Sequence, residues 1–354
     1  MSIIRPFIWL TALATAVGLA APASAQTYQP FIDPNYFGLP DMQFFAPAEV
    51  GDYSGLEPPN TGFYFDFDRL YLYANRPDGE ASLFSDNTGD FAWGNRYEMG
   101  YMTDEKTGWQ VLAWNLNGPN ENLVNAELQQ FVQIDVPAAS VQLDNYYYGL
   151  TSLNTMELSS VELNKIWRRK EFHEGSVLEL LLGFRQMTLI DYYRRDLLGE
   201  LPGPIAATSF VTYDSELAEF NNFMYGGQLG GRWFQQRGHW LLSFETKFFA
   251  LANNQTLKNE QVNKILDFDP IDGSLIDVIG TDVNRSRTYS HANQFVWGGE
   301  FRLEAAYELT RDISLRVGSQ FTDLGRGVGR GNLLRVNDQD VQLAGVTFGL
   351  TINR

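Results

Sequence analysis

The amino-acid sequence predicts an all-β protein, a transmembrane antiparallel up-and-down β-barrel of about ten strands. Three observations predict this fold class: an N-terminal leader, strands with one apolar and one charged face, and long connections that all fall on one side. Outer-membrane barrels combine these features, because their strands face lipid on one side and a polar interior on the other, and because their periplasmic turns are short.

Residues 1–25 have the pattern of a secretory signal peptide. Arg5 supplies a positive charge, Pro6–Leu19 is a short apolar stretch, and Ala23–Ala25 is a small-residue cleavage site. A membrane-spanning anchor is the alternative, but it needs about 20 apolar residues. We therefore expect cleavage near Ala25. Since no later run resembles a transmembrane helix, we expect an outer-membrane location in barrel form.

The overall charge excludes several kinds of partner. The chain of 354 residues has 43 Asp and Glu against 26 Lys and Arg, which gives a net charge of −17. Such a balance argues against nucleic acid and against an anionic surface as partners, and a solvated, self-repelling exterior is the favoured explanation. Cysteine is absent, so disulfides, iron–sulfur clusters and thiol catalysis are excluded, and we expect no cofactor.

Residues 26–62 precede the regular alternation and are rich in proline. Proline removes a backbone donor and fixes φ, so this segment predicts an extended periplasmic linker. Aromatic residues such as Tyr28, Phe31 and Phe44 leave a second interpretation open, in which the segment packs as a plug inside the barrel.

From Gly62 onward apolar and polar residues alternate almost continuously. Successive side chains of a strand point to opposite faces, so the stretch from Phe295 to Tyr307 has one apolar face and one with charges of both signs. We expect a barrel domain over residues 63–354, with several strands longer than is usual in soluble sheets. The predicted strands are Phe63–Tyr73, Gly94–Met102, Gly108–Leu116, Met156–Trp167, Val177–Ile190, Asn222–Trp233, Trp240–Ala252, Gln294–Glu308, Ile313–Phe321 and Val341–Ile352.

The connections alternate between short turns and long segments. The short turns are Thr103–Thr107, Arg168–Ser176, Phe234–His239 and Leu309–Asp312, and the long segments are Ala74–Trp93, Asn117–Thr155, Asp191–Asn221, Asn253–Asn293 and Thr322–Asp340. Outer-membrane barrels show this asymmetry, whereas a soluble secreted β-sandwich has no reason to keep it. If Leu123–Ile134 and Ser140–Leu150 were two further strands, the barrel would have twelve strands and a wider bore.

Aromatic residues mark the edge of the predicted membrane band. Each lies within a few residues of a short turn, where an amphipathic ring would rest at the level of the lipid headgroups. A tryptophan in a protein core is the alternative for each one taken singly. The predicted interface residues are Tyr101, Trp109, Trp167, Trp233, Trp240 and Tyr307.

The opposite face of the predicted strands collects charges of both signs. Five carboxylates and five cations balance there, which predicts a salt-bridged interior with little open bore, because an unpaired buried charge is costly. A selectivity constriction is the alternative. The predicted lumen-lining residues are Glu162, Glu179, Arg185, Arg232, Glu245, Lys247, Glu300, Arg302, Glu304 and Arg316.

Three linked stretches resemble the planctomycete outer-membrane β-barrel protein family. They are Ser160–Arg168, Glu179–Arg185 and Asn221–Trp233, and the likeness continues through Trp240–Asn254 and covers most of the mature chain. The motifs are specific as a set and weak individually. The resemblance implies location and architecture, but no molecular activity and no functional residue. One departure concerns the end of the sequence, where Asn353 and Arg354 follow the last apolar alternation instead of an aromatic residue.

Catalytic and metal-binding motifs are weak. His291 with Ser290 and Asp282 is the only arrangement resembling a catalytic set, and a solvated loop histidine explains it as well. A calcium site at Asp267, Asp269 and Asp272 lacks the closing glutamate of an EF-hand and contains a proline, so an acidic surface loop is favoured. Residues Gly325–Gly331 open no helix, so they predict a flexible basic tip that touches acidic polysaccharide rather than a phosphate cradle.

Three classes of function follow from these features. The first is a non-enzymatic outer-membrane barrel with a structural or surface-interaction role and a narrow, charge-lined lumen. The second is a passive, porin-like channel for small solutes, and the third is a secreted β-sandwich. The expected partners are outer-membrane lipid and the barrel-insertion machinery, with surface polysaccharide or other envelope proteins as candidates for the loops.

Overall fold

The computed structural model describes eleven stretches of the chain, namely residues 62–77, 89–104, 106–125, 128–136, 139–169, 176–202, 209–268, 275–277, 284–310, 313–331 and 335–353. The predicted signal peptide and nearly all of the proline-rich segment lie outside the described residues. The strands are β1 (Gly62–Asn75), β2 (Gly89–Met102), β3 (Thr107–Asn125), β4 (Leu128–Val136), β5 (Ala139–Arg168), β6 (Ser176–Pro202), β7 (Ser209–Arg237), β8 (Trp240–Phe268), β9 (Leu275–Asp277), β10 (Asn284–Glu308), β11 (Ile313–Val328) and β12 (Gln339–Asn353).

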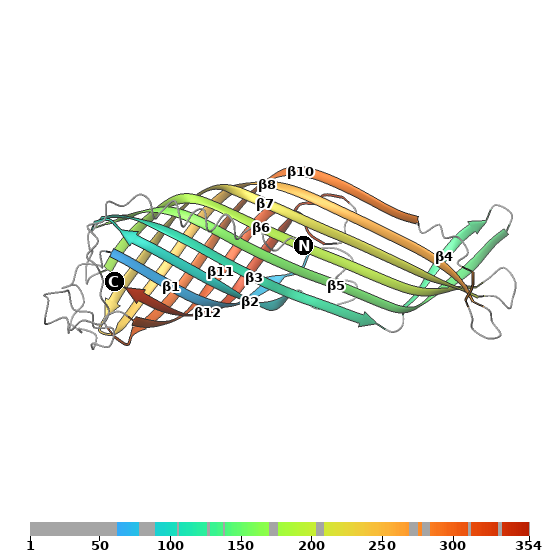
Figure 1. Cartoon of the computed structure of the whole chain (residues 1–354), viewed down its shortest axis with the longest axis horizontal. Helices are drawn as coiled ribbons and strands as arrows, with labels where there is room; N and C mark the ends of the chain where they lie inside the picture. The colour runs from blue at the N-terminus through green and yellow to red at the C-terminus, as the bar shows by residue number, and fades with distance from the viewer. Residues whose placement is uncertain are drawn as a thin grey trace. The chain divides into compact units, whose positions relative to one another are not determined.

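Ten of these strands close into an antiparallel ring. Neighbours follow the order β1, β2, β3, β5, β6, β7, β8, β10, β11 and β12, and β12 pairs with β1 to complete the circle. Each of the ten predicted strands lies within one of them, so the predicted barrel is confirmed (Figure 1). A closed ring cannot be a two-sheet sandwich, which removes the third functional class. The described part of the chain holds no helix long and apolar enough to cross a membrane.

The register around the ring gives the stagger of the strands. Ladder partners lead from Ala305 on β10, through Arg69 on β1 and Thr188 on β6, back to Asn293 on β10, a stagger of twelve residues. With ten strands, this corresponds to a strand tilt of about 40°. Each residue then rises by about 2.5 Å along the barrel axis.

Strands β5, β6, β7, β8 and β10 are much longer than a bilayer requires. They contain 25 to 30 residues, whereas β1, β2, β11 and β12 contain 14 to 16. A tilted strand crosses a membrane with about 9–11 residues. The predicted long loops at Asp191–Asn221 and Asn253–Asn293 are therefore wrong over most of their length, because they continue as paired strands (Figure 1).

The alternative of twelve wall strands is also wrong. Residues Ser140–Leu150 belong to the single long strand β5, and β4 pairs only with β5 among the described strands. These segments form a hairpin that prolongs the wall, and they do not widen the ring. The alternation of apolar and polar residues correctly predicts that these segments are strands. It does not predict which strands they pair with, and the number of strands in the ring depends on that pairing.

Three layers of inward-facing side chains are stacked along the barrel. The barrel has a turn side, where the short turns join the strands, and a mouth at the opposite end. On β8, from the turn side to the mouth, Glu245 and Lys247 are charged, Phe249 and Leu251 are apolar, and Asn253 and Gln255 are polar. The same order recurs on other strands, so we call them the charged layer, the apolar layer and the mouth layer. The apolar layer is the core of the barrel, formed by Leu70, Leu72, Ala74, Ala92, Leu112, Trp114, Leu116, Met156, Leu158, Met187, Leu189, Met224, Phe249, Leu251, Val296, Leu324, Val328, Val341 and Leu343.

Candidate functional site

The structure brings the predicted lumen-lining residues together in the charged layer. Seven of the ten are buried, and Arg232, Glu304 and Arg316 are only partly exposed. Every one of them forms an ion pair. Arg168 and Glu179 form a pair of their own at 2.9 Å on the turn side of the layer.

Several of these ion pairs span the ring. Arg96 on β2 contacts Glu245 on β8 at 3.5 Å, and these strands are five places apart in a ring of ten. Arg232 on β7 reaches Glu98 on β2 at 2.7 Å. Arg185 on β6 reaches Glu300 on β10 at 2.9 Å. Side chains from opposite walls therefore meet in the middle of the barrel at this level.

Four members of the charged layer are absent from the lumen-lining residues that the sequence predicts. Asp66, Asp68, Arg96 and Glu98 lie on β1 and β2 and are almost completely buried. Arg302 contacts Asp68 at 2.9 Å, and Arg96 contacts Glu98 at 2.9 Å. The signal was present, because these residues alternate with the outward-facing aromatic residues of both strands.

Glycine makes room for the largest charged side chains. The ladder partner of Arg185 is Gly226, and the partner of Arg316 is Gly349. A methyl group at Gly349 would overlap a carboxylate oxygen of Asp68, and one at Gly226 would overlap the backbone of β8. These inward positions therefore exclude even alanine, while the charged side chain opposite each one fills the space.

The mouth layer is closed by a segment that folds into the barrel. Residues Gly327–Gly331 are buried, and Gly327 has φ +117°, a backbone conformation that favours glycine. Asn222 donates to the Gly329 carbonyl at 2.8 Å and accepts from the Gly329 amide at 2.7 Å. Arg330 is 1% exposed and donates to the backbone carbonyl of Asn75 at 2.8 Å. The expectation of a flexible basic tip is therefore wrong for this segment, and only Arg326 before it is exposed.

Most of the predicted interface residues are exposed on the outer wall. Tyr101, Trp109, Trp167, Trp240 and Tyr307 are between 38% and 50% exposed, while Trp233 is partly buried. After correction for the stagger, the six rings lie within about 8 Å of one another along the barrel axis. The outer wall on the mouth side of these rings carries many exposed large apolar side chains, as expected for a band facing hydrocarbon.

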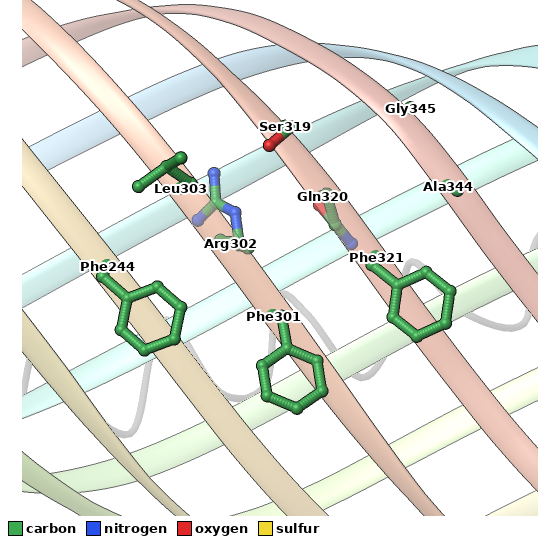
Figure 2. Close-up of a pocket in the computed structure, with 9 residues that line it drawn as sticks. All are labelled: Phe244, Phe301, Arg302, Leu303, Ser319, Gln320, Phe321, Ala344 and Gly345. Atoms are coloured by element: carbon green, nitrogen blue, oxygen red, sulfur yellow. The ribbon is translucent and has the colours of Figure 1, made fainter.

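A shallow hollow of about 290 Å³ interrupts the outer wall at β8, β10, β11 and β12. Figure 2 shows its rim, formed by the phenyl rings of Phe244, Phe301 and Phe321 from three neighbouring strands. The small residues Ser319 and Ala344 leave space between the rings. The hollow lies within the apolar band of the outer wall.

The wall beyond the mouth has a polar exterior. Glu260 on β8 accepts hydrogen bonds from Arg285 at 2.6 Å and from Arg287 at 2.8 Å, both on β10. Hydrogen bonds from Arg287 and Arg285 hold the pKa of Glu260 below its usual value. Such exposed pairs contribute modestly to stability.

The weak catalytic and metal candidates lie only partly within the described residues. His291 contacts the Thr256 hydroxyl at 3.2 Å, and Ser290, its neighbour on the strand, points to the opposite face. Asp269, Asp272 and Asp282 lie outside the described residues, as does the side chain of Asp267. Within the described ranges, no group of three or more His, Cys, Asp or Glu residues could hold a metal ion.

Comparison with protein-family models gives a match over residues 76–351, to the family described as Putative beta barrel porin-7 (BBP7). The match covers most of the chain. The chain belongs to this family. This family is one of outer-membrane β-barrels, in agreement with the closed ring and its apolar outer wall.

Solved structures similar to this porin-7 family member share little sequence with it. The outer membrane protease OmpT from Escherichia coli is 9% identical with a TM-score of 0.45, and the match covers 85% of this chain and 99% of that chain. The toluene transporter TodX from P. putida is 6% identical with a TM-score of 0.28, over 84% of this chain and 91% of that chain. No curated protein matches the chain.

Proposed function

We propose that this protein is a non-enzymatic barrel of the outer membrane with a structural or surface-interaction role, whose lumen is closed. The observation that carries the proposal is the set of ion pairs that span the ring, from Arg96 to Glu245 and from Arg232 to Glu98. These four residues have little exposed surface, so they fill the bore and do not merely line it.

Energetics support a closed lumen. Opening a path past Glu300, for example, requires its separation from Arg185 at 2.9 Å and from Arg96 at 3.7 Å. Leaving one buried charge without its partner costs about 3–5 kcal/mol, so an open state would be rare unless water and ions replaced the lost contacts. The apolar layer above consists mainly of aliphatic and aromatic side chains, which offer little solvation to a permeating ion.

The wall beyond the mouth supports the surface-interaction role. It is built from paired strands rather than loops, and it offers a rigid polar surface outside the membrane band. We propose surface polysaccharide or other envelope proteins as partners there, and the barrel-insertion machinery as a partner during assembly. The planctomycete source that the motif set predicts remains a prediction.

A passive small-solute channel is the second candidate. The charged layer favours it, because balanced acids and bases are also the lining of a selectivity constriction. The two candidates differ in a single property. A channel needs a continuous wet path, whereas the closed barrel has side chains meeting across the ring.

Reconstitution in a planar bilayer tests the proposal. We expect no conductance steps from the wild-type protein once insertion has been verified by a heat-dependent shift on detergent gels. Arg96→Ala, which removes one ring-spanning cation, should also stay silent. Steady steps from the wild type, altered in size or ion selectivity by Arg96→Ala, would instead identify a channel constriction.

A further inference from the structure

Arg69 is a charged residue on the outer wall. It faces outward on β1 between Phe67 and Tyr71, and it is exposed. Its ladder partner on β2 is Asn95, and two residues further on the same strands Tyr71 pairs with Trp93. Six residues earlier, Phe63 pairs with Tyr101 of the predicted interface ring. Arg69 therefore originates inside the apolar band, where an uncompensated cation costs about 2–4 kcal/mol at the midplane.

The side chain of Arg69 is turned toward the edge of this band that lies on the mouth side of the barrel. Its guanidinium lies 5.2 Å from the centre of the Trp93 ring, and Nη1 donates to the Asn95 side-chain oxygen at 2.7 Å. A guanidinium has five N–H donors, so one neutral acceptor leaves most of them available. Within the described part of the chain, no carboxylate pairs with Arg69, whereas Arg285 and Arg287 on the same outer surface both pair with Glu260.

The surroundings of Arg69 suit an amphiphile rather than a soluble anion. Aromatic rings cover β1 and β2 on both sides of it, with Phe67 near Tyr97 at 5.3 Å and Tyr71 near Trp93 at 4.5 Å. On the other side its ladder partner is Phe348 on β12, a strand that also contributes Ala344 to the outer hollow. A phosphate with an attached acyl chain can approach from the lipid phase, whereas a free anion would have to enter hydrocarbon.

We propose that Arg69, with Asn95 and Trp93, binds the phosphate of an anionic membrane lipid in the leaflet on the mouth side of the barrel. One acyl chain of this lipid follows the neighbouring strands into the hollow between Phe301 and Phe321. The phosphate supplies the counter-charge that the chain itself does not give Arg69, and charge-assisted bonds from arginine to phosphate are among the stronger hydrogen bonds in proteins. The small residues Ser319 and Ala344 in the lining leave room for this chain between the phenyl rings.

Native mass spectrometry and thermal unfolding of the full barrel test this site. The protein is placed in nanodiscs of phosphatidylcholine alone or with added phosphatidic acid, and a third arm adds inorganic phosphate to phosphatidylcholine discs. We expect phosphatidic acid to raise the unfolding temperature and to remain bound in the mass spectrum. Arg69→Gln should weaken this binding at least tenfold, and Arg69→Lys should retain part of it.

Two matched variants complete the test. Arg287→Gln removes an exposed arginine outside the apolar band and should leave the response to phosphatidic acid unchanged. Ala344→Leu fills the hollow and should reduce lipid binding without removing the charge. The proposal fails if Arg69→Gln binds phosphatidic acid as well as the wild type does, or if inorganic phosphate alone reproduces the stabilisation. Neither result depends on whether the lumen conducts, so the site and the closed lumen are tested separately.

Discussion

Replacement of Arg185 by methionine should strongly destabilise the barrel. Arg185 is completely buried, contacts Glu162 at 2.6 Å and Glu300 at 2.9 Å, and lies over the ring of Phe249 at 4.4 Å. Methionine keeps the packing against the ring but leaves both carboxylates without this cation. Among the described residues, Glu162 retains Lys247 at 3.1 Å, whereas the remaining ion pair of Glu300 is with Arg96 at 3.7 Å.

The magnitude depends mainly on Glu300. A buried charge that loses its closest partner costs about 3–5 kcal/mol, so we expect the free energy of unfolding to fall by this amount. The assay is urea unfolding of the barrel refolded in phospholipid, followed by tryptophan fluorescence. The double substitution Arg185→Met with Glu300→Gln should restore a substantial part of the loss, because it removes the stranded carboxylate.

An exposed ion pair serves as the control. Arg194 lies 3.0 Å from Asp196 and is 44% exposed, so Arg194→Met should cost less than about 1 kcal/mol. If Arg185→Met proves as mild as this control, or if Glu300→Gln gives no rescue, the charged layer is not a tightly coupled network. These ion pairs would then provide no energetic barrier to the opening of the lumen.

Three further predictions concern glycine, the mouth and pH. Gly226→Ala should prevent or severely impair refolding because its methyl group meets the backbone of β8, while Gly227→Ala, which meets nothing within 4 Å, should refold normally on detergent gels. Asn222→Ala removes both hydrogen bonds to Gly329, so hydrogen exchange at the mouth segment should accelerate, with the charged layer unaffected as the internal reference. Because the pKa of Glu260 is lower in the folded protein, its ionised carboxylate stabilises the fold at pH values above the usual carboxyl pKa. This stabilisation is lost as the pH falls through the lower pKa of the folded state. Hydrogen exchange in β8 and β10 beyond the mouth should therefore rise only at acid pH, and Glu260→Gln should abolish that dependence.

The membrane-spanning part of the fold was predictable because lipid imposes a general rule. Most outward positions in the band are apolar, so the alternation on β10 between Phe301 or Leu303 and Glu300 or Arg302 predicts which side chains face outward. This rule does not apply beyond the mouth, because the outer surface of the wall contacts water there. Glu219 and Lys258, for example, pair across β7 and β8 on the outer surface at 3.1 Å, and polar residues of this kind resemble a loop in the sequence.

The mouth segment was missed for a different reason. Glycine-rich sequence predicts flexibility locally, but the groups that order this segment come from distant positions. Asn253 donates to the Gly327 carbonyl at 2.7 Å, and the Gly331 amide donates to Asp191 at 2.6 Å. Neither Asn253 nor Asp191 stands out alone, because each is one polar residue at the end of a predicted strand.

The three inward layers act in series, and this determines how a path could open. In the closed lumen that we propose, a solute entering from the mouth would displace Gly327–Gly331, then pass the apolar layer, and then separate ion pairs such as Arg96 with Glu245. Because each layer is a separate barrier to the solute, removal of one layer leaves the other two barriers in place. Arg96→Ala alone should therefore leave the barrel silent. A conducting Arg96→Ala variant beside a silent wild type would mean that the charged layer is the only seal, and that the apolar and mouth layers admit water.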